Sequence, residues 1–394
     1  MHTKRLIGFL AAIALTLTGA VPVCAQHTAR PPKAGPLYSG DTLTICIMGD
    51  MMMHSAQLEN AFRSGNRYDF SPYFRLLEND IASADIAVAN MEFTLAGPPY
   101  TGYPAFSAPD CYAEYLAQCG FDVFLAANNH IFDKGSDGAE RTLEQYRGLS
   151  ERYGIRFTGL AGNQEERDRT TPLIIRKRGI HIALINFTYG TNTGQDRHWP
   201  KVNYIGEKTL LKEALGKAEE SADICMVLPH WGTEYELVHD TKQESEAAWL
   251  AEGGADAIIG THPHVVQDIG CMKTASGMVP VAYSLGNAIS NMSARNTQLG
   301  LMATLKVIKA GNGDISIRSI RYRYVWCSRP GGYGNSYMAV PVKDFLDRRD
   351  EWQGKWDHDK MVSTYRMTEG LSGPKDDYEY NISDDQTEHQ TRSH

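Results

Sequence analysis

The sequence predicts an α/β fold in a single large domain, and three observations support this prediction. Short runs of β-branched residues alternate with segments of helical period from Thr42 to about residue 260, the order typical of α/β proteins. Strand-like runs dominate after that point, which favours a mixed sheet or two facing sheets. The 394 residues are 42% apolar and 22% charged, so the chain can bury a large core and is not a collagen, a coiled coil or a wholly disordered protein.

The expected elements follow one another in chain order. The strands are short apolar runs at Leu43–Met48, Ile86–Ala89, Val123–Ala126, Ile180–Phe187, Ile224–Leu228, Ala257–Ile259, Val279–Ser284, Leu299–Ile308 and Ile315–Val325. Helices are expected near Pro72–Ser83, Cys111–Cys119, Gly138–Arg152, Lys208–Ser221 and Lys242–Glu252, where apolar residues recur with helical spacing. The glycines of Ala310–Asp314 suit a hairpin turn between the last two strands.

The two ends of the chain differ in composition from its middle. Lys4 and Arg5 precede an apolar run that ends in small residues, which is the pattern of a signal peptide. We therefore expect an exported protein of the periplasm or cell surface, with membrane association through a retained signal as the alternative. The expected divisions are a signal peptide (1–25), a linker (26–41), the main domain (42–330), a C-terminal extension (331–375) and a disordered acidic tail (376–394).

Charge and cysteine content exclude several classes of protein. Lys and Arg number 39 against 47 Asp and Glu, a net charge of −8, so the chain is not built to bind nucleic acid or an anionic membrane surface. Six cysteines follow the signal region, without a Cys-x-x-Cys pair. A chain of this length does not need disulfides, and we predict neither a disulfide framework nor a cysteine-ligated metal.

Polar residues able to bind metal ions stand directly after five of the expected strands. α/β folds place ligand sites at such strand ends. An isolated carboxylate there is more often a helix cap, but five positions in register favour a shared site. Asp, Glu, Asn and His without Cys suit Zn²⁺, Mn²⁺, Fe or Mg²⁺. The residues are Asp50, Glu92, Asn128–His130, His230 with Glu234, and His262 with His264.

His262 and His264 lie two residues apart. On an extended segment both side chains would point the same way, and Pro263 restricts His262 to extended geometry. The spacing therefore predicts that the two imidazoles share one target.

Six short motifs of the sequence are Gly49–Met52, Asn90–Glu92, Asn128–His130 with Asp133, His230–Tyr235, Gly260–Val265 and Tyr283–Asn287. Together they resemble the CapA family, the bacterial capsule and poly-γ-glutamate synthesis proteins. The resemblance covers about Thr42 to Asn291. It implies the calcineurin-like metallophosphatase fold, in which two β-sheets pack between helices with a metal site at one end. It also implies an anionic extracellular polymer or its precursor, and membrane-bound synthesis and export proteins, as partners.

The resemblance also implies roles for single residues. His130 matches the histidine that assists the leaving group, and Glu92 stands at the position of a bridging ligand. Met52 stands where the superfamily has a ligand histidine, so the number of divalent ions (Mn, Zn, Fe or Mg) is left open at one or two. His54 is a candidate to replace the missing histidine ligand. The metal ligands implied are Asp50, Glu92, Asn129, His230, His262 and His264.

Four further residues are candidates for supporting roles. Asp133 either orients His130 or caps the helix expected after it, and the sequence leaves both open. Glu234, Asn287 and Arg295 are candidate substrate contacts, Glu234 alternatively an acid behind the metal ligands.

Two functions of different class are compatible with these residues. The first is an exported metal-dependent hydrolase of the phosphoesterase type, which His130 favours because a purely structural site has little use for it. The alternative is a non-catalytic polymer-binding factor for assembly or export, which Met52 favours. The sequence does not choose between a phosphoester and an amide of the polymer as substrate.

Overall fold

The structure is a computed structural model that describes residues 23–24, 42–65, 67–193 and 198–382. Most of the predicted signal peptide, the whole linker and residues 383–394 of the predicted tail lie outside the described residues.

The larger of two main sheets in the described chain has nine strands. Its order is β19-β18-β17-β2-β5-β6-β7, with β16 paired to β2 and β20 paired to β18. The strands β2, β5, β6 and β7 are parallel, whereas β17 is antiparallel to β2. In chain order they span Thr42–Met51 (β2), Ile86–Met91 (β5), Val123–Leu125 (β6), Arg156–Thr158 (β7), Asn287–Ile289 (β16), Leu299–Lys309 (β17), Ile315–Ser328 (β18), Met338–Pro341 (β19) and Tyr378–Asn381 (β20).

The second main sheet of the described chain has six strands in the order β14-β15-β13-β12-β10-β9. Its central strands β10, β12, β13 and β15 are parallel. They span Leu173–Lys177 (β9), Ile180–Thr188 (β10), Ile224–His230 (β12), Ala257–Ile259 (β13), Ile269–Thr274 (β14) and Gly277–Ala282 (β15). Two small sheets complete the topology of the described chain. One has three strands in the order β1-β4-β3, Val23–Cys24 (β1), Phe62–Arg63 (β3) and Arg67–Tyr68 (β4), and the other pairs Leu160–Ala161 (β8) with Lys201–Val202 (β11).

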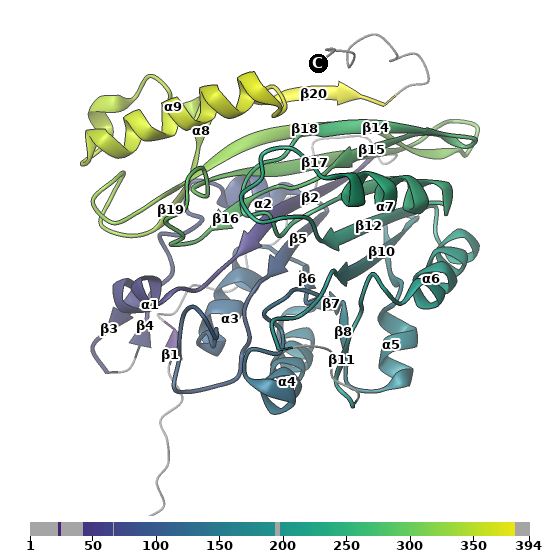
Figure 1. Cartoon of the computed structure of the whole chain (residues 1–394), viewed down its shortest axis with the longest axis horizontal. Helices are drawn as coiled ribbons and strands as arrows, with labels where there is room; N and C mark the ends of the chain where they lie inside the picture. The colour runs from purple at the N-terminus through teal and green to yellow at the C-terminus, as the bar shows by residue number, and fades with distance from the viewer. Residues whose placement is uncertain (1–22, 25–41, 66, 194–197, 383–394) are drawn as a thin grey trace, which may run out of the picture.

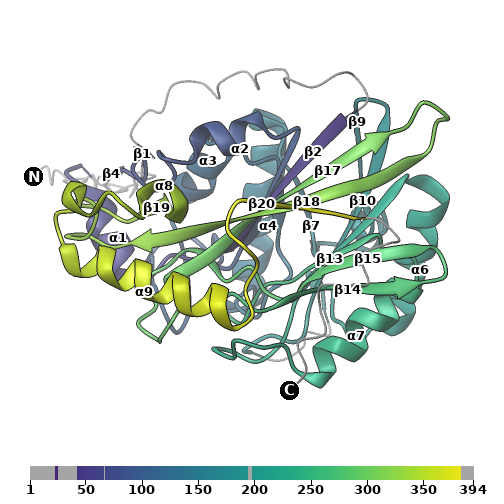
Figure 2. The same cartoon turned by 90° about the horizontal axis from the view of Figure 1, so that it is seen from above.

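Helices flank both sheets. Figure 2 shows α2 and α3 on one side of the strands and α6 and α7 on the other. The helices are Ser55–Ala61 (α1), Glu78–Ser83 (α2), Asp110–Gln118 (α3), Gly135–Tyr153 (α4), Gln164–Thr170 (α5), Lys208–Ser221 (α6), Thr241–Glu252 (α7), Val342–Phe345 (α8) and Lys355–Leu371 (α9), with a 3₁₀ turn at Arg349–Glu351.

Alternation along the strands separates the apolar side chains into three layers. On β2, Ile45 and Ile47 point into a core between the sheets, whereas Cys46 and Met48 point to α3 and α4. The same alternation on β10, β12 and β13 divides residues between the middle core and a layer under α6 and α7. This confirms the sandwich of two sheets between helices that the resemblance implies.

A recurring aspartate joins neighbouring parallel strands. Asp122 precedes β6, and its Oδ2 accepts the backbone N–H of Ala87 on β5 at 2.7 Å. Asp223 before β12 and Asp256 before β13 do the same for His181 and Cys225, each at 2.7 Å. Asp85 before β5 accepts from Thr44 at 2.9 Å. Each carboxylate satisfies a backbone donor at the entry end of the sheet and fixes the strand register.

The expected strands and most expected helices are present. The helix expected at Pro72–Ser83 is shorter, because residues 71–77 form turns and α2 begins at Glu78. The hairpin turn at residues 310–314 joins β17 and β18 as expected. The six cysteines from Cys46 onward form no disulfide in the described chain.

The prediction that the whole tail from residue 376 is disordered is wrong for its first part. Tyr378–Asn381 forms β20, which pairs with β18 next to β19. Glu379 accepts a hydrogen bond from Lys306 at 2.8 Å and another from Ser319. The open edge of the long strand β18 supplies backbone partners that composition alone does not reveal.

The segment expected as a C-terminal extension continues the same fold. It adds β19 to the large sheet, and α9 lies along the outside of β18 (Figure 1). Asp357 on α9 is fully buried and accepts hydrogen bonds from Ser328 Oγ at 2.6 Å and Trp326 Nε1 at 3.2 Å. These bonds attach α9 to the end of β18.

Candidate metal centre

The predicted metal ligands meet where strands of both sheets end. Asp50 lies near the end of β2, Glu92 directly follows β5, and His230 is the last residue of β12. His262 and His264 lie in the loop after β13. The two sheets therefore bring these strand ends to one place, as the sequence pattern predicted.

Two glycines allow the backbone around Asp50 to approach the β16 region. A Cβ atom on Gly49 would lie 1.9 Å from the carbonyl oxygen of Gly286, so no larger residue fits there. The next residue, Asp50, donates its N–H to this same oxygen at 2.9 Å. This close approach holds Asp50 next to Asn287, its register partner on β16.

Glu92 lies at the centre of the site and is fully buried. Its Oε1 is 3.6 Å from His264 Nε2, 3.7 Å from His230 Nε2 and 4.0 Å from His130 Nε2. Among the described residues, neither carboxylate oxygen has a hydrogen-bond donor. Burial, and next the nearby Asp50, raise the pKa of Glu92 well above its usual range. A buried carboxylate without donors is costly unless a cation compensates it, so these residues fit a metal ion.

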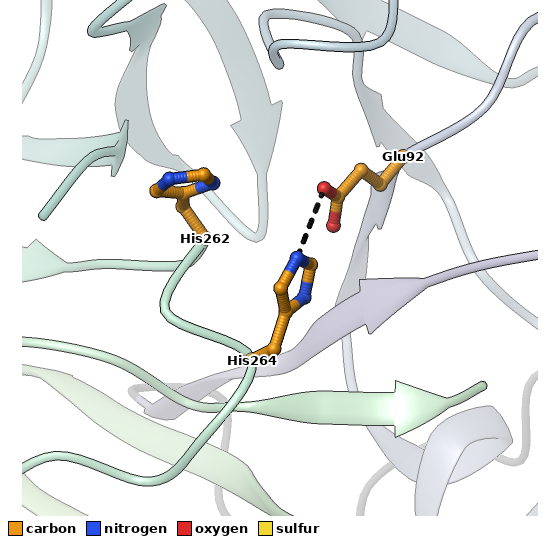
Figure 3. Close-up of side chains that lie close together, drawn as sticks. All are labelled: Glu92, His262 and His264. Atoms are coloured by element: carbon orange, nitrogen blue, oxygen red, sulfur yellow. Dashed lines mark ion pairs between the residues drawn. The ribbon is translucent and has the colours of Figure 1, made fainter. Parts of the chain in front are cut away.

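Glu92 belongs to two overlapping sets of potential ligands. Glu92, His262 and His264 form one set, and Asp50, Glu92 and His230 form the other; within each set the ligand atoms lie within 4.8 Å of one another. Figure 3 shows the side chains of His262, His264 and Glu92 directed toward a common space. Because Glu92 is shared, the arrangement has room for one cation or two neighbouring ones.

Asn129 joins the site from the loop after β6. Its Oδ1 lies 2.9 Å from Nε2 of His230. His230 is fully buried, and burial followed by the charges of His262 and His264 lowers its pKa well below the usual value. His230 is therefore neutral, which is the form that can bind a metal ion.

The His-Pro-His segment is not extended, and the prediction from its spacing is wrong in this respect. His262 has φ +100° and His264 φ +60°, both in the left-handed region that non-glycine residues rarely adopt. The N–H of His262 donates to Asp50 Oδ2 at 3.3 Å, which helps to hold the turn. Both imidazoles still face Glu92, so their convergence comes from a strained turn and not from strand geometry.

The two histidines of this turn differ in their surroundings. Nδ1 of His262 is buried and has no hydrogen-bond partner within the described chain, and burial lowers the pKa of this ring well below the usual value. Nδ1 of His264 lies 3.0 Å from Asn287 Oδ1 and 3.3 Å from Asp50 Oδ2. Burial is the largest single influence on His264 and opposes its charged form, but the hydrogen bond and charge of Asp50, the charge of Glu234 and the bond to Asn287 together raise the pKa. With Nδ1 occupied, Nε2 of His264 faces Glu92.

His130 is oriented by Asp133, one of the two roles that the sequence left open. Asp133 Oδ2 lies 2.7 Å from His130 Nδ1 and accepts the backbone N–H of Phe106 at 2.8 Å. Helix α4 begins at Gly135 with Lys134 at its N-cap and no side-chain cap bond, so Asp133 is not the cap. The edge of His130 also meets the ring of Phe106, with centroids 4.6 Å apart.

Three polar residues of the site were not identified from sequence. Asn90 is buried and donates from Nδ2 to Asp50 Oδ1 at 2.7 Å. Thr261 Oγ1 lies 3.1 Å from His230 Nδ1, and Asn192 Nδ2 lies 3.2 Å from His130 Nδ1. Asn90 and Thr261 stand beside predicted ligands in the motifs, which was a usable signal. Asn192 lies in a loop without such a marker.

Neither Met52 nor its proposed replacement His54 adds a nitrogen ligand to the two sets. Met52 is 2% exposed and packs in the core under α3 and α4, so it supplies no nitrogen ligand. His54 is not part of either ligand set in the described chain. Its Nδ1 lies 3.2 Å from the backbone N–H of Asn291, and burial lowers its pKa to about 4.

The candidate substrate contacts occupy different positions. Asn287 is buried behind His264, whereas Glu234 is exposed beside Tyr235. Arg295 is exposed in the turn after β16, and none of the described contacts of the metal-site residues involves it. The positive charge of Arg329, and not that of Arg295, contributes to the lowered pKa of His54.

Two exposed tyrosines adjoin the buried histidines. Burial, then the carboxylates of Glu234 and Glu92, raise the pKa of Tyr189 to about 12. Burial and Glu234 likewise raise the pKa of Tyr235 to about 12. The charge of Glu234 thus lies close enough to raise the pKa of both phenols and of Glu92.

Comparison with known protein families gives one match over most of the chain. The model described as "Bacterial capsule synthesis protein PGA_cap" matches residues 44–292, which include every residue of the two ligand sets. The capsule biosynthesis protein CapA of Bacillus anthracis is 26% identical over 313 residues, covering 75% of this chain and 72% of that protein. The PGA biosynthesis protein CapA of Bacillus subtilis is 25% identical over 303 residues, covering 74% of each.

Solved structures with a related architecture include a 5′-nucleotidase precursor from Thermus thermophilus. It has a TM-score of 0.45 and 13% identity, and the match covers 83% of this chain and 58% of that one. The purple acid phosphatase PPD1 from yellow lupin has a TM-score of 0.35 and 10% identity, covering 78% and 56% of the two chains.

Proposed function

The chain belongs to the PGA_cap family of bacterial capsule synthesis proteins, and we propose that it serves this process as an exported, metal-dependent hydrolase of the phosphoesterase type. Its partners are an anionic extracellular polymer or its precursor and membrane-bound synthesis and export proteins. The similarity to the two CapA proteins of Bacillus supports the link to capsule polymer.

The observation that carries the proposal is the carboxylate of Glu92. It is fully buried, has no hydrogen-bond donor in the part of the chain that the structure describes, and lies within 4.0 Å of imidazole nitrogens from His130, His230 and His264. A site kept only for structure would replace such a group by an apolar one at little cost. The presence of this carboxylate supports a divalent cation as part of the working protein.

The residues of the site have two roles: one group would bind the cation, and His130 with Asp133 would transfer a proton. Asp50, Glu92, Asn129, His230, His262 and His264 would hold one or two ions of Mn, Zn, Fe or Mg. A bound cation would polarise the phosphoryl oxygen of the substrate and activate a water molecule. His130, 4.0 Å from Glu92 and held at Nδ1 by Asp133, would donate a proton from Nε2 to the leaving oxygen.

Export is supported by the sequence of residues 1–25, which has the signal-peptide pattern. In the part of the chain that the structure describes, no helix combines the length and apolarity needed to cross a bilayer.

The test combines metal content with turnover. The chain without residues 1–25 is purified without chelator, its metal content is measured by elemental analysis, and hydrolysis of bis(p-nitrophenyl) phosphate is followed. We expect one or two equivalents of metal and a measurable kcat. His130→Ala should keep the metal and lose at least a hundredfold in kcat. His181→Ala, on β10 away from the ligand sets, is the control. Unchanged turnover in His130→Ala would remove His130 from the mechanism.

A second function, a non-catalytic polymer-binding factor, is favoured by Met52. Its buried side chain leaves the site with one nitrogen ligand fewer than the superfamily pattern. In that case the wild-type protein would bind γ-linked polyglutamate without hydrolysing any phosphoester, and His130→Ala would bind it equally well.

A further inference from the structure

Three exposed tyrosines surround the candidate metal centre. In the described chain, eight large apolar or aromatic side chains are exposed, and Tyr103 at 73%, Tyr189 at 40% and Tyr235 at 43% are among them. They come from three separate loops, which follow β5, β10 and β12. We call these three residues the tyrosine rim.

Each member of the tyrosine rim contacts the site directly or through one ring. The Tyr189 ring lies 4.5 Å from that of His262 at an interplanar angle of 39°, and Tyr235 lies 6.3 Å from His264 at 33°. Tyr103 reaches the site through Phe106, whose centroid is 6.4 Å from Tyr103 and 4.6 Å from His130. Aromatic rings thus adjoin three of the site's histidines.

The backbone attaches two of these tyrosines to metal-site residues. Tyr189 N–H donates to the carbonyl of His230 at 2.9 Å, and Tyr235 N–H donates to the carbonyl of Pro263 at 2.9 Å. Tyr235 also has φ +69°, a conformation that a bulky residue adopts only at a cost. The backbone of each tyrosine is therefore fixed relative to the metal centre, which places both rings beside it as a binding surface requires.

The charge around the tyrosine rim is negative. The charged groups with the largest effects on Glu92 are Asp50, Glu234 and Asp133. Glu234 is exposed, and its negative charge raises the pKa of both Tyr189 and Tyr235. A cation in the site can neutralise the buried acids and hold one phosphate, but exposed Glu234 opposes the approach of a chain of further carboxylates.

We propose that the tyrosine rim binds the sugar ring of a sugar phosphate whose phosphate lies at the metal centre, an inference that rests on the proposed phosphoesterase function. The apolar C–H face of a pyranose packs against an aromatic ring, its hydroxyls donate to the Glu234 carboxylate, and the tyrosine hydroxyls offer further hydrogen bonds. Hydrolysis adds one water across the P–O bond and releases the free sugar and inorganic phosphate.

The test measures binding and turnover with ring-bearing and ring-free phosphates. The ring-bearing probes are the 1-phosphates of glucose, galactose, mannose and N-acetylglucosamine, and glycerol 3-phosphate is the ring-free probe. Dissociation constants are measured by calorimetry on Mn²⁺-loaded protein carrying His130→Ala to prevent turnover. We expect at least one hexose 1-phosphate to bind more tightly than glycerol 3-phosphate.

Variants of the tyrosine rim separate ring contact from phosphate contact. Tyr189→Ala and Tyr235→Ala should each weaken binding of the preferred hexose 1-phosphate about fivefold, and leave glycerol 3-phosphate unchanged. Tyr189→Phe should retain most of the affinity because it keeps the ring. Tyr378→Ala removes a tyrosine of similar exposure (51%) on β20 and should change nothing.

Three outcomes would overturn the sugar assignment: no hexose 1-phosphate binds, binding does not depend on Tyr189 or Tyr235, or a γ-linked glutamate oligomer binds more tightly through the same tyrosines. Turnover by the wild-type protein distinguishes failure of the sugar assignment from failure of the proposed phosphoesterase function. Hydrolysis of all phosphates without dependence on the tyrosine rim keeps the phosphoesterase and removes the sugar site. Tyrosine-dependent binding without hydrolysis keeps the sugar site and removes the phosphoesterase.

Discussion

The side-chain oxygen of Asn287 lies 3.0 Å from Nδ1 of His264, while Nε2 of the same ring faces Glu92. Asn287 is fully buried and also donates from Nδ2 to the carbonyl of Thr297 at 2.9 Å. It therefore fixes the orientation and tautomer of a candidate metal ligand from behind.

Asn287→Ala should weaken metal binding while leaving the protein folded. Loss of the partner at Nδ1 frees the His264 ring to rotate, and such partners typically contribute ten- to a hundredfold in metal affinity. Because Asp50 also lies 3.3 Å from Nδ1, we expect the lower end, about tenfold. A competition titration with a fluorescent chelator measures it, with Asn312→Ala in the exposed β17–β18 turn as the control. Equal affinities in both variants would contradict the positioning role.

The sequence predicted which candidate ligands lie together at this site better than it predicted the residues that support them. Asp50, Glu92 and His230 each stand at the end of an apolar strand, so parallel pairing alone brings them together. The position of Asn287 depends on the pairing of β16 with β2 and on the contact between Gly49 and Gly286, which are distant in sequence. Local pattern does not contain that information, so Asn287 was predicted as a substrate contact.

Glu92→Gln should stabilise the metal-free protein and abolish its stabilisation by metal. The amide carries no charge, so it avoids the cost of burying a carboxylate without donors beside Asp50, which we place at about 1 to 3 kcal/mol. The wild type should gain stability on adding Mn²⁺, about 2.7 kcal/mol at a hundred times the Kd, and the variant should not. Thermal unfolding with and without Mn²⁺ measures both effects.

Glu144→Gln is the matched control for this experiment, because Glu144 is exposed on α4. A metal-free Glu92→Gln protein less stable than wild type would show that Glu92 has hydrogen-bond donors that the structure lacks.

Asp133→Asn should lower kcat without changing metal content. The carboxylate lies 2.7 Å from His130 Nδ1 and holds the ring in the orientation in which Nε2 faces the site. The amide keeps an acceptor for the N–H of Phe106 but removes the charge, so we expect a loss of ten- to a hundredfold in kcat. Steady-state kinetics with elemental analysis of the same samples measure this. A parallel loss of metal would instead make Asp133 part of the metal site.

The fold prediction also succeeded where structure depends on local sequence and failed where it depends on contacts between residues distant in sequence. The alternation of strands and helices depends on local periodicity and predicted nearly every element of the sandwich. The β20 strand forms because β18 offers an open edge, and the His262–His264 turn adopts positive φ because it packs between Asp50 and the neighbouring loops. Composition predicted disorder for the first, and proline stereochemistry predicted extension for the second.

His54 should make the metal-free protein less stable as the pH falls. Burial, with smaller effects from His264, His130 and Arg329, lowers its pKa from 6.5 to about 4, and a hydrogen bond from its Nδ1 to Gln57 Oε1 opposes this shift. Below pH 6.5 the unfolded chain therefore binds a proton that the folded protein does not accept until about pH 4, and stability is lost across this window. The loss is at most roughly 3 kcal/mol, reduced by the partial exposure of the ring.

The measurement is the free energy of unfolding in urea at several pH values between 7 and 4. His54→Gln should show a shallower decline than the wild type, whereas His181→Gln, a partly exposed histidine on β10, should follow the wild type. Contributions from His230 and His262 are common to all three proteins and cancel in the comparison. Identical slopes in His54→Gln and wild type would exclude His54 as a source of acid sensitivity.

Asp122→Ala should destabilise the fold by about 2 kcal/mol, since it leaves the buried N–H of Ala87 without its acceptor. The bond is 2.7 Å long and joins β5 to the start of β6. Asp122→Asn retains an acceptor oxygen and should cost less than half as much, while Asp350→Ala, at a fully exposed position, should cost nothing measurable. Urea unfolding gives all three values. Because an aspartate also precedes β5, β12 and β13 with the same bond, a small effect at Asp122 would show that strand register depends on the apolar layers alone.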